Sequence, residues 1–173
     1  FATVSVIEDR REGFLQGVLV SPSPRTAIAG GKILGGALIA LIHAGIFLLT
    51  APLAGIHLTF PGHVLLLPYM LVLAIGLTGL GFCLSWKMTS VQGFHAIMMV
   101  FLMPMWLLSG AVFPPTGLPF VLKWMIYLNP MTYGVALIRY GFYPGRDNIM
   151  DGMPNYWVAL LVTIGFAILM VYF

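Results

Sequence analysis

The stretch ILGGALIALIHAGIFLLTAPLAGI, residues 33–56, carries no charged side chain. A helix of about 20 apolar residues crosses the hydrocarbon core of a bilayer, because that core is about 30 Å thick and a helix rises about 1.5 Å per residue. Three further stretches meet this criterion, at 64–86, 94–113 and 156–173. The sequence therefore predicts four full membrane-spanning helices.

The composition of the 173-residue chain points the same way. Hydrophobic residues make up 60% of the chain and charged residues only 8%, and the mean hydropathy is +1.00. Soluble domains carry about 25% charged residues. The net charge of +3 is too small, and the basic residues are too scattered, to indicate a nucleic-acid partner. We predict an all-α, polytopic membrane helical bundle in which residues 1–173 form a single domain surrounded by the lipid bilayer.

Both ends of the sequence lie inside apolar runs. Residues 1–7, FATVSVI, resemble the tail of a further span, and the run 156–173 stops without a polar residue after it. We therefore expect the chain to be truncated at both ends, with four full spans and the tail of a fifth.

Charge is concentrated in IEDRREGFLQGVLVSPSPRT, residues 7–26. In a helix over 8–20, apolar side chains fall on one stripe, and Pro22 ends the helix. The pattern predicts an amphipathic helix on the membrane surface whose charged start binds a partner protein; a solvated loop is the alternative. The charged start is Glu8, Asp9, Arg10, Arg11, Glu12 and Gly13, and the stripe is Phe14, Leu15, Val18 and Leu19.

Lysine and arginine are unevenly divided between the two sides of the predicted bundle. Because basic residues are enriched on the cytoplasmic side of membrane proteins, we expect 8–32 and 87–93 in the cytoplasm, and 57–63 and 114–155 outside. The cytoplasmic side then holds Arg10, Arg11, Arg25, Lys32 and Lys87, and the other side holds Lys123, Arg139 and Arg146.

The segment 114–155 contains apolar pieces, such as 118–128, that are too short to span a membrane. Prolines punctuate the segment, and proline favours helix starts and breaks. Backbone at membrane depth must have its polar groups satisfied by protein or water. We therefore predict short re-entrant helices packed on the spans, with an ordinary extramembrane loop as the alternative.

Several function classes lack support. The four spans contain no Asp or Glu, although a proton-driven transporter keeps a carboxylate in the membrane as its relay. The sequence has no HExxH, no GxSxG and no GxxxxGK[ST] motif, so it predicts no metal, catalytic or ATP site. His43 is either a neutral imidazole bonded to a neighbouring helix or a polar contact in a substrate path.

Small residues recur at helical spacing near the first full span. Gly31 and Gly35 form a GxxxG pair, and Gly36, Ala40 and Ala44 form a second ridge. Such ridges allow helices to approach closely. Packing within the chain is the favoured interpretation, and contact with a second subunit is the alternative.

Three stretches, in order, resemble the permease subunits of type-2 ATP-binding-cassette exporters. EDRREGFLQGVLVSPSPRTAIAGGK, 8–32, is similar to the family's charged link, Ser-Pro turn and Gly-Lys pair. MPMWLLSGAVFPPTGLP, 103–119, contains its Ser-Gly-x-x-Phe-Pro pattern, and LNPMTYGVALIRYGFY, 128–143, is the third match. The residues that carry the second and third matches are Ser109, Gly110, Phe113, Pro114, Asn129, Pro130 and Arg139.

This resemblance implies six spans in the intact subunit, a cytoplasmic coupling helix after the second span, and outer re-entrant helices between the fifth and sixth. It also implies pairing of two permease subunits, as a homodimer or heterodimer. Each would contact a separate ATPase subunit that binds ATP and Mg, so this chain would be a permease without its own cofactor. We expect a location in a bacterial cytoplasmic (inner) membrane. The cargo could be a drug, a lipid or a glycan, and the alternative function is a non-transporting structural or assembly subunit.

Overall fold

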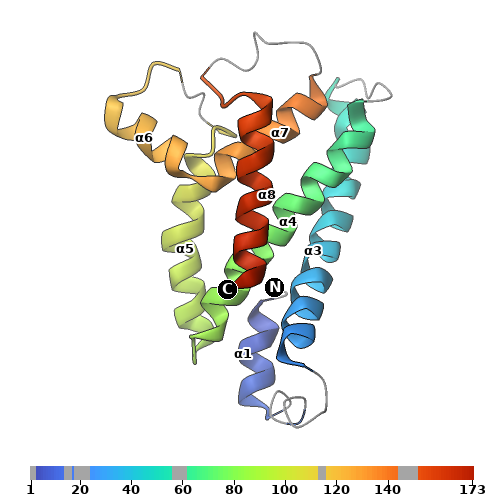
Figure 1. The fold of residues 1–173 in the computed structure, drawn as a ribbon, viewed down its shortest axis with the longest axis vertical. Coiled ribbons are helices and arrows are strands. Elements are labelled where there is room, and N and C mark those ends of the chain that lie inside the picture. Colours follow the sequence, from blue (N-terminus) through green and yellow to red (C-terminus); the bar gives the residue numbers. More distant parts are fainter. Residues whose placement is uncertain (1–2, 14–16, 18–23, 56–61, 113–115, 144–151) are drawn as a thin grey trace.

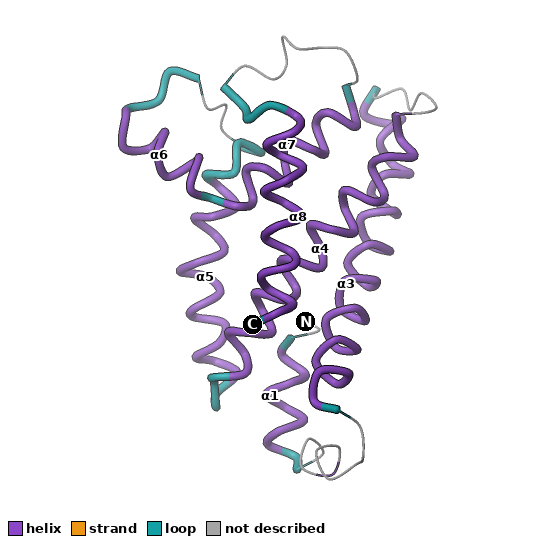
Figure 2. Tube along the Cα trace, viewed as in Figure 1, coloured by secondary structure: helices purple, strands orange, loops and turns teal. Residues whose placement is uncertain are grey.

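The computed structural model describes residues 3–13, 17, 24–55, 62–112, 116–143 and 152–173, and every regular element among them is helical. Figure 2 shows the helices in purple along the trace. The predicted all-α class is thus confirmed. The elements are α1 (Val4–Arg11), α3 (Arg25–Thr50), the 3₁₀ turn η1 (Ala51–Ala54), α4 (Gly62–Trp86), α5 (Val91–Leu107), α6 (Phe120–Leu128), α7 (Pro130–Phe142) and α8 (Tyr156–Tyr172).

Four helices, α3, α4, α5 and α8, run lengthwise through the bundle (Figure 1). At one end, which we call the α1 end, α1 finishes, α3 begins and α4 is followed by α5. At the opposite end, the α6–α7 end, the two short helices lie across the direction of α5 (Figure 1). The charged segment and the proline-bounded segment therefore lie at opposite ends of the bundle.

Helix α4 is the centre of the packing, since it contacts α3, α7, α8 and α1. It is apolar on all sides, as expected for a helix surrounded by protein and lipid. Its glycines leave room for α8: a Cβ at Gly76 would lie 2.7 Å from Phe166 Cδ1, and one at Gly79 would lie 2.9 Å from Met170 Cβ. The thiol of Cys83 also donates to the Met170 oxygen, at 3.7 Å.

Within the part of the chain that the structure describes, two helices are each long and apolar enough to cross a membrane, Thr26–Leu53 and Val64–Trp86. They correspond to the predicted spans 33–56 and 64–86. Helices α5 and α8 have 17 residues each, which makes them about 25 Å long. This length is at the lower limit for crossing a bilayer.

Two span boundaries differ from the prediction. Helix α3 begins at Arg25, well before residue 33, because Pro24 occupies the N-cap and fixes the start of the helix. Helix α5 covers Val91–Leu107 instead of 94–113. It starts early because the Ser90 hydroxyl caps it by accepting from Gly93 N, and after Leu107 the chain turns away.

The predicted surface helix 8–20 does not start at Glu8. Residues 8–11 form the last turn of α1 and thus continue the helix that holds residues 4–7 of the predicted tail. Gly13 follows with a φ of 78°, a left-handed conformation that ends helices and that glycine adopts without strain. The apolar stripe, Phe14, Leu15, Val18 and Leu19, lies outside the described residues, and its amphipathic helix stays a prediction.

The proline-bounded segment does form two short helices, α6 and α7, as predicted. Pro119 is the N-cap of α6, and Pro130 occupies the start of α7. Proline suits these positions because its fixed φ matches the helix and its missing N–H is not needed there.

Candidate functional site

Helix α1 is anchored to the bundle by its apolar side. Val6 and Ile7 are each only 1% exposed. Thr3 packs on α4 at Gly81, where a Cβ would lie 2.9 Å from Thr3 Cγ2. The helix that carries the charged residues therefore packs against α4 through its buried side.

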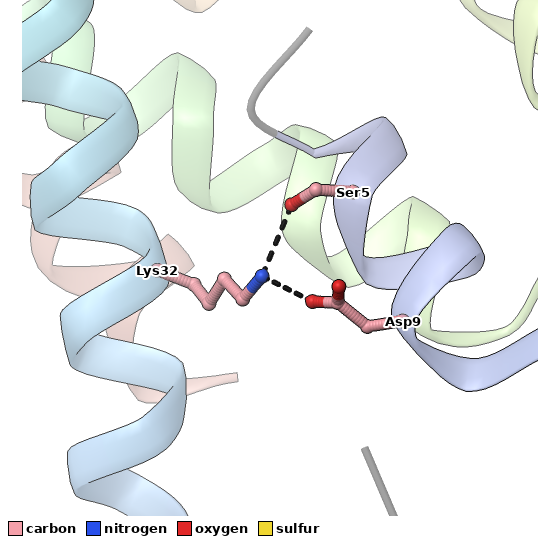
Figure 3. A network of polar contacts seen from close by, with 3 residues as sticks. All are labelled: Ser5, Asp9 and Lys32. Carbon is pink, nitrogen blue, oxygen red and sulfur yellow. Dashed lines mark hydrogen bonds and ion pairs between the residues drawn. The ribbon is translucent and has the colours of Figure 1, made fainter. Parts of the chain in front are cut away.

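A polar network fixes α1 to α3 as well (Figure 3). The ammonium group of Lys32 forms an ion pair with the Asp9 carboxylate and donates to the Ser5 hydroxyl at 3.1 Å. The Lys32 and Asp9 side chains are 31% and 21% exposed, so solvent screens the pair only in part. No other ion pair occurs in the described part of the chain.

The charged residues predicted to bind a partner thus separate into two groups. Asp9 faces α3 and has an intramolecular partner in Lys32, and its contact with a partner protein stays a prediction. Glu8, Arg11 and Glu12 are exposed at the end of α1, followed by the turn at Gly13. The Arg10 side chain and Phe14 lie outside the described residues. The α1 end therefore presents an exposed charged surface on a helix that is anchored to two spans.

At the opposite end, Asn129 connects three helices. It is 7% exposed and lies between α6 and α7. Its Nδ2 donates to the Met105 oxygen in the last turns of α5, at 2.5 Å, and its Oδ1 accepts from Met131 N, at 3.0 Å. The second bond is the N-cap of α7. One amide side chain thus caps α7 and holds it against α5.

Arg139 provides a second link between α7 and α5. Its Nη2 donates to the Gly110 oxygen at 2.6 Å. Gly110 has a φ of 81°, and the turn around it is stabilised by Ser109, whose hydroxyl donates to the Trp106 oxygen at 2.6 Å and accepts from Ala111 N at 3.3 Å. Ser109 is fully buried.

The structure therefore brings together family-matching residues that lie far apart in the sequence. Ser109 and Gly110 form the turn after α5, and Asn129 and Arg139 bond to the backbone of that region. Pro130 begins α7. Phe113 and Pro114 lie outside the described residues. These contacts hold α6 and α7 against the end of α5.

Sequence reasoning missed several hydrogen bonds within α6 and α7. The Thr132 hydroxyl donates to the Ile126 oxygen at 2.7 Å, and the Tyr133 hydroxyl donates to the Tyr127 oxygen at 2.7 Å. Burial raises the pKa of Tyr133, with the neighbouring Tyr127 as a smaller cause, so Tyr133 stays a donor. The spacing of six residues across a helix break could have suggested both bonds.

A tyrosine contact between α4 and α8 was also missed. The hydroxyls of Tyr69 and Tyr156 lie 2.8 Å apart, and the ring of Tyr140 lies edge-on to Tyr156 at 5.7 Å. Tyr69 and Tyr156 are 87 residues apart, and no local pattern links them. The contact joins α4, α7 and α8 near the α6–α7 end.

His43 bonds within its own helix. Its Nδ1 lies 2.7 Å from the Ile39 oxygen, and the side chain is exposed. A bond from His43 to a neighbouring helix is not seen among the described residues, and a polar contact in a substrate path stays a prediction. Gly31 and Gly35 are exposed too, and a Cβ on either would meet no other atom within 4 Å. The Gly31–Gly35 pair therefore does not pack within the described residues, whereas Gly36 of the second ridge is buried.

The described residues offer no cluster of three or more His, Cys, Asp or Glu side chains that could hold a metal ion. They do form an apolar groove of about 540 Å³ between α4 and α8. The groove is lined by Val72, Ile75, Ile164, Ala167, Ile168, Val171 and Tyr172.

The comparison with known proteins assigns the family. The sequence pattern of the family described as "ABC-2 type transporter" matches residues 1–143. Two curated relatives, each called "probable multidrug ABC transporter permease YbhR", come from Escherichia coli strain K12 and from Escherichia coli O157:H7. Each is 28% identical over 163 residues, covering 93% of this chain and 44% of the relative. The chain thus spans less than half the length of these relatives. Since the family pattern matches well over half of the chain, and all described elements are helical, the chain belongs to the ABC-2 type transporter family as a membrane permease subunit.

Proposed function

We propose that this chain is the membrane-spanning subunit of an ATP-driven exporter in a bacterial cytoplasmic membrane. It forms part of the translocation path, pairs with a second permease subunit, and receives energy from a separate ATPase that binds ATP and Mg. The family assignment supports transport, and the geometry at the α1 end supports the coupling.

The division of charges at the α1 end is the observation that carries this proposal. Glu8, Arg11 and Glu12 are exposed, while Asp9 turns inward to Lys32. Exposed charges give a partner something to recognise, and they set association rate and specificity more than affinity. An inward ion pair, by contrast, transmits movement of α1 to α3.

The packing of α1 makes it suited to transmit a displacement. Its apolar residues Val6 and Ile7 are buried, and Thr3 packs directly on Gly81 of α4. A force applied by an ATPase to the charged surface would move α1 together with the adjacent parts of α3 and α4. Packed helices shift as units because protein interiors are dense and compress little.

The relatives and the groove between α4 and α8 support a class of cargo to test. The two relatives carry the word multidrug in their name, and a groove of about 540 Å³ lies within the range of small-molecule sites. Its lining is apolar. Small aromatic, membrane-soluble compounds are therefore the first cargo to test.

The decisive experiment uses the full-length permease with its ATPase, reconstituted in liposomes. Co-purification, ATP hydrolysis and efflux of ethidium are measured for the wild type and for the double reversal Glu8→Lys/Arg11→Glu. We expect the reversal to weaken ATPase association and to lower efflux in parallel. The loss should change with ionic strength, because salt screens exposed charges beyond about 8–10 Å at physiological concentration.

The matched control is Lys123→Glu, which reverses an exposed charge at the α6–α7 end and should leave ATPase association unchanged. Wild-type association and efflux in the double reversal would remove the coupling role from the end of α1. A complex that assembles but moves no cargo, with ATP hydrolysis unaffected by any compound tested, would favour the structural subunit over the exporter.

A further inference from the structure

The tryptophans of this chain lie near the two ends of the helical bundle. Of the four in the sequence, Trp86 is the last residue of α4, at the α1 end. Trp106, Trp124 and Trp157 lie in the last turn of α5, in α6 and in the first turn of α8. All four are exposed. Tryptophan gathers at this position in membrane proteins, because its ring is stable at the boundary between lipid tails and headgroups.

Helix α6 carries its tryptophan on a continuous apolar face. Phe120, Val121 and Leu128 are 74%, 68% and 76% exposed, and Trp124 and Met125 continue the same stripe. On the opposite side Ile126 is 1% exposed, and this side packs on α7. Large apolar side chains on such a stripe favour an apolar environment over water.

Lys123 lies inside this aromatic surface. Phe120, Lys123, Trp124 and Tyr127 line one open-sided pocket. Lys123 has no ion-pair partner among the residues that the structure describes. Such a pocket suits a ligand with a negatively charged group on apolar chains, because the cation attracts the charge and the three aromatic rings contact the chains.

We propose that α6 lies in the bilayer interface at the α6–α7 end, and that its pocket binds the phosphate headgroup of an anionic lipid through Lys123. The orientation of the helix agrees with this placement, because α6 runs across the direction of α5 instead of along it (Figure 1). The aromatic rings then lie against the glycerol and upper acyl chains. Among possible occupants, a lipid accounts for both the exposed apolar stripe and the positive charge within it.

The hydrogen bonds of Asn129 connect the proposed lipid site on α6 to helix α5. Asn129 follows α6 directly and bonds to Met105 of α5. Lipid bound on one side of α6 is therefore connected through one residue to the end of a span. The inference depends on the membrane location of the family and not on transport or on the ATPase.

The test measures contact between Trp124 and lipid. In the full-length subunit, every tryptophan except Trp124 is replaced by Phe, including Trp86, Trp106 and Trp157. The protein is placed in nanodiscs of phosphatidylcholine with dibrominated acyl chains, since bromine quenches tryptophan on contact. We expect stronger quenching by bromines near the headgroup than by bromines near the bilayer centre. Absence of quenching would mean that water or another protein covers α6, and would overturn the placement.

The headgroup is tested by adding brominated phosphatidylglycerol, which is anionic, to unbrominated phosphatidylcholine. One lysine at an anionic surface should give a preference of about fivefold. Lys123→Gln should abolish this preference, whereas Lys87→Gln, beside Trp86 at the other end, should keep it. Equal preference in Lys123→Gln and the parent would overturn the lipid site.

A second measurement keeps all tryptophans, in case their removal prevents folding. Met125→Cys, in a background where every other cysteine of the full-length subunit, Cys83 included, is replaced by Ser, places a nitroxide label on the same face of α6. Collision with oxygen, which partitions into lipid, should exceed that with a water-soluble nickel chelate. The reverse order would place α6 in water and overturn the proposal.

Discussion

The guanidinium of Arg139 donates to the backbone oxygen of Gly110 at 2.6 Å, across 29 residues of sequence. Arg139 lies in the last turn of α7, and Gly110 lies in the turn that follows α5. The bond therefore closes the α6–α7 segment back onto the span from which it emerged. Together with Asn129, it makes the position of two short helices depend on two side chains.

Replacing Arg139 with Gln should destabilise the subunit by about 2 kcal/mol, the size of a hydrogen bond made by a charged group. Arg139→Lys should restore only part of the lost free energy of unfolding, because an ammonium group lacks the planar fork of guanidinium. The free energy of unfolding is measured in mixed detergent micelles by circular dichroism. Lys123→Gln, an exposed site at the same end, serves as the control. A change in Arg139→Gln no larger than that of the control would show that the bond contributes nothing.

Two substitutions at Asn129 should separate its two bonds. Asn129→Asp keeps the acceptor that caps α7 but loses the donor to Met105, so α7 should stay protected from hydrogen exchange while the end of α5 loosens. Asn129→Ala loses both bonds, and the missing cap alone costs about 1 kcal/mol. Hydrogen exchange of 105–110 and 130–134 is compared between the variants. Equal exchange of both regions in Asn129→Asp would contradict this separation.

The sequence predicted the helical class, and long apolar helices lie where the spans were expected, because apolar length is a local property. Span boundaries were less predictable where a polar segment is nonetheless helical. RTAIAGGK, 25–32, forms the first two turns of α3 because Pro24 starts the helix there. No hydropathy criterion detects this, since the segment has a charged residue at each end.

The candidate site was predictable only in part, for a different reason. Asn129 and Arg139 were singled out by the family resemblance, and both have hydrogen-bond partners in the structure. Their partners are backbone oxygens of Met105 and Gly110, which no side-chain pattern can reveal. The inward direction of Asp9 was also unpredictable, since Lys32 lies on the far side of a segment whose path the sequence does not determine.

Gly134→Ala should destabilise the contact between α7 and α4. A Cβ at Gly134 would clash with the Leu73 side chain, and overpacking a dense interior costs about 1–3 kcal/mol. Gly35→Ala is the matched control, because a Cβ there meets nothing within 4 Å and alanine favours helix. Unfolding of the purified subunit should show a loss only for Gly134→Ala. Equal stability of both variants would indicate that Leu73 moves aside without cost.

Gly13→Ala should destabilise the end of α1, since an alanine in the left-handed conformation costs about 1–2 kcal/mol. Gly13→Asn should cost less, because asparagine tolerates this conformation better than alanine. The free energy of unfolding is measured for both, together with co-purification of the ATPase. If alanine and asparagine behaved alike, the left-handed turn would not be what ends α1.

The last prediction concerns the Asp9–Lys32 pair. Exposed ion pairs contribute about 0.2–1 kcal/mol, whereas removing one partner of a buried pair costs about 3–5 kcal/mol. With side chains 21% and 31% exposed, this pair should fall between these limits, at about 1–2 kcal/mol. The measurement is a double-mutant cycle with Asp9→Asn, Lys32→Gln and the double variant, which isolates the interaction energy of the two side chains.

If the pair also transmits movement from α1 to α3, each single variant should keep its ATPase bound yet lower efflux per ATP hydrolysed. The exchanged variant Asp9→Lys/Lys32→Asp should restore part of that efflux, since it restores attraction between the same helices. Asp151→Asn, which removes a carboxylate far from α1 in the sequence, controls for net charge. An interaction energy near zero, with efflux per ATP unchanged in all variants, would reduce the pair to a surface contact without a part in coupling.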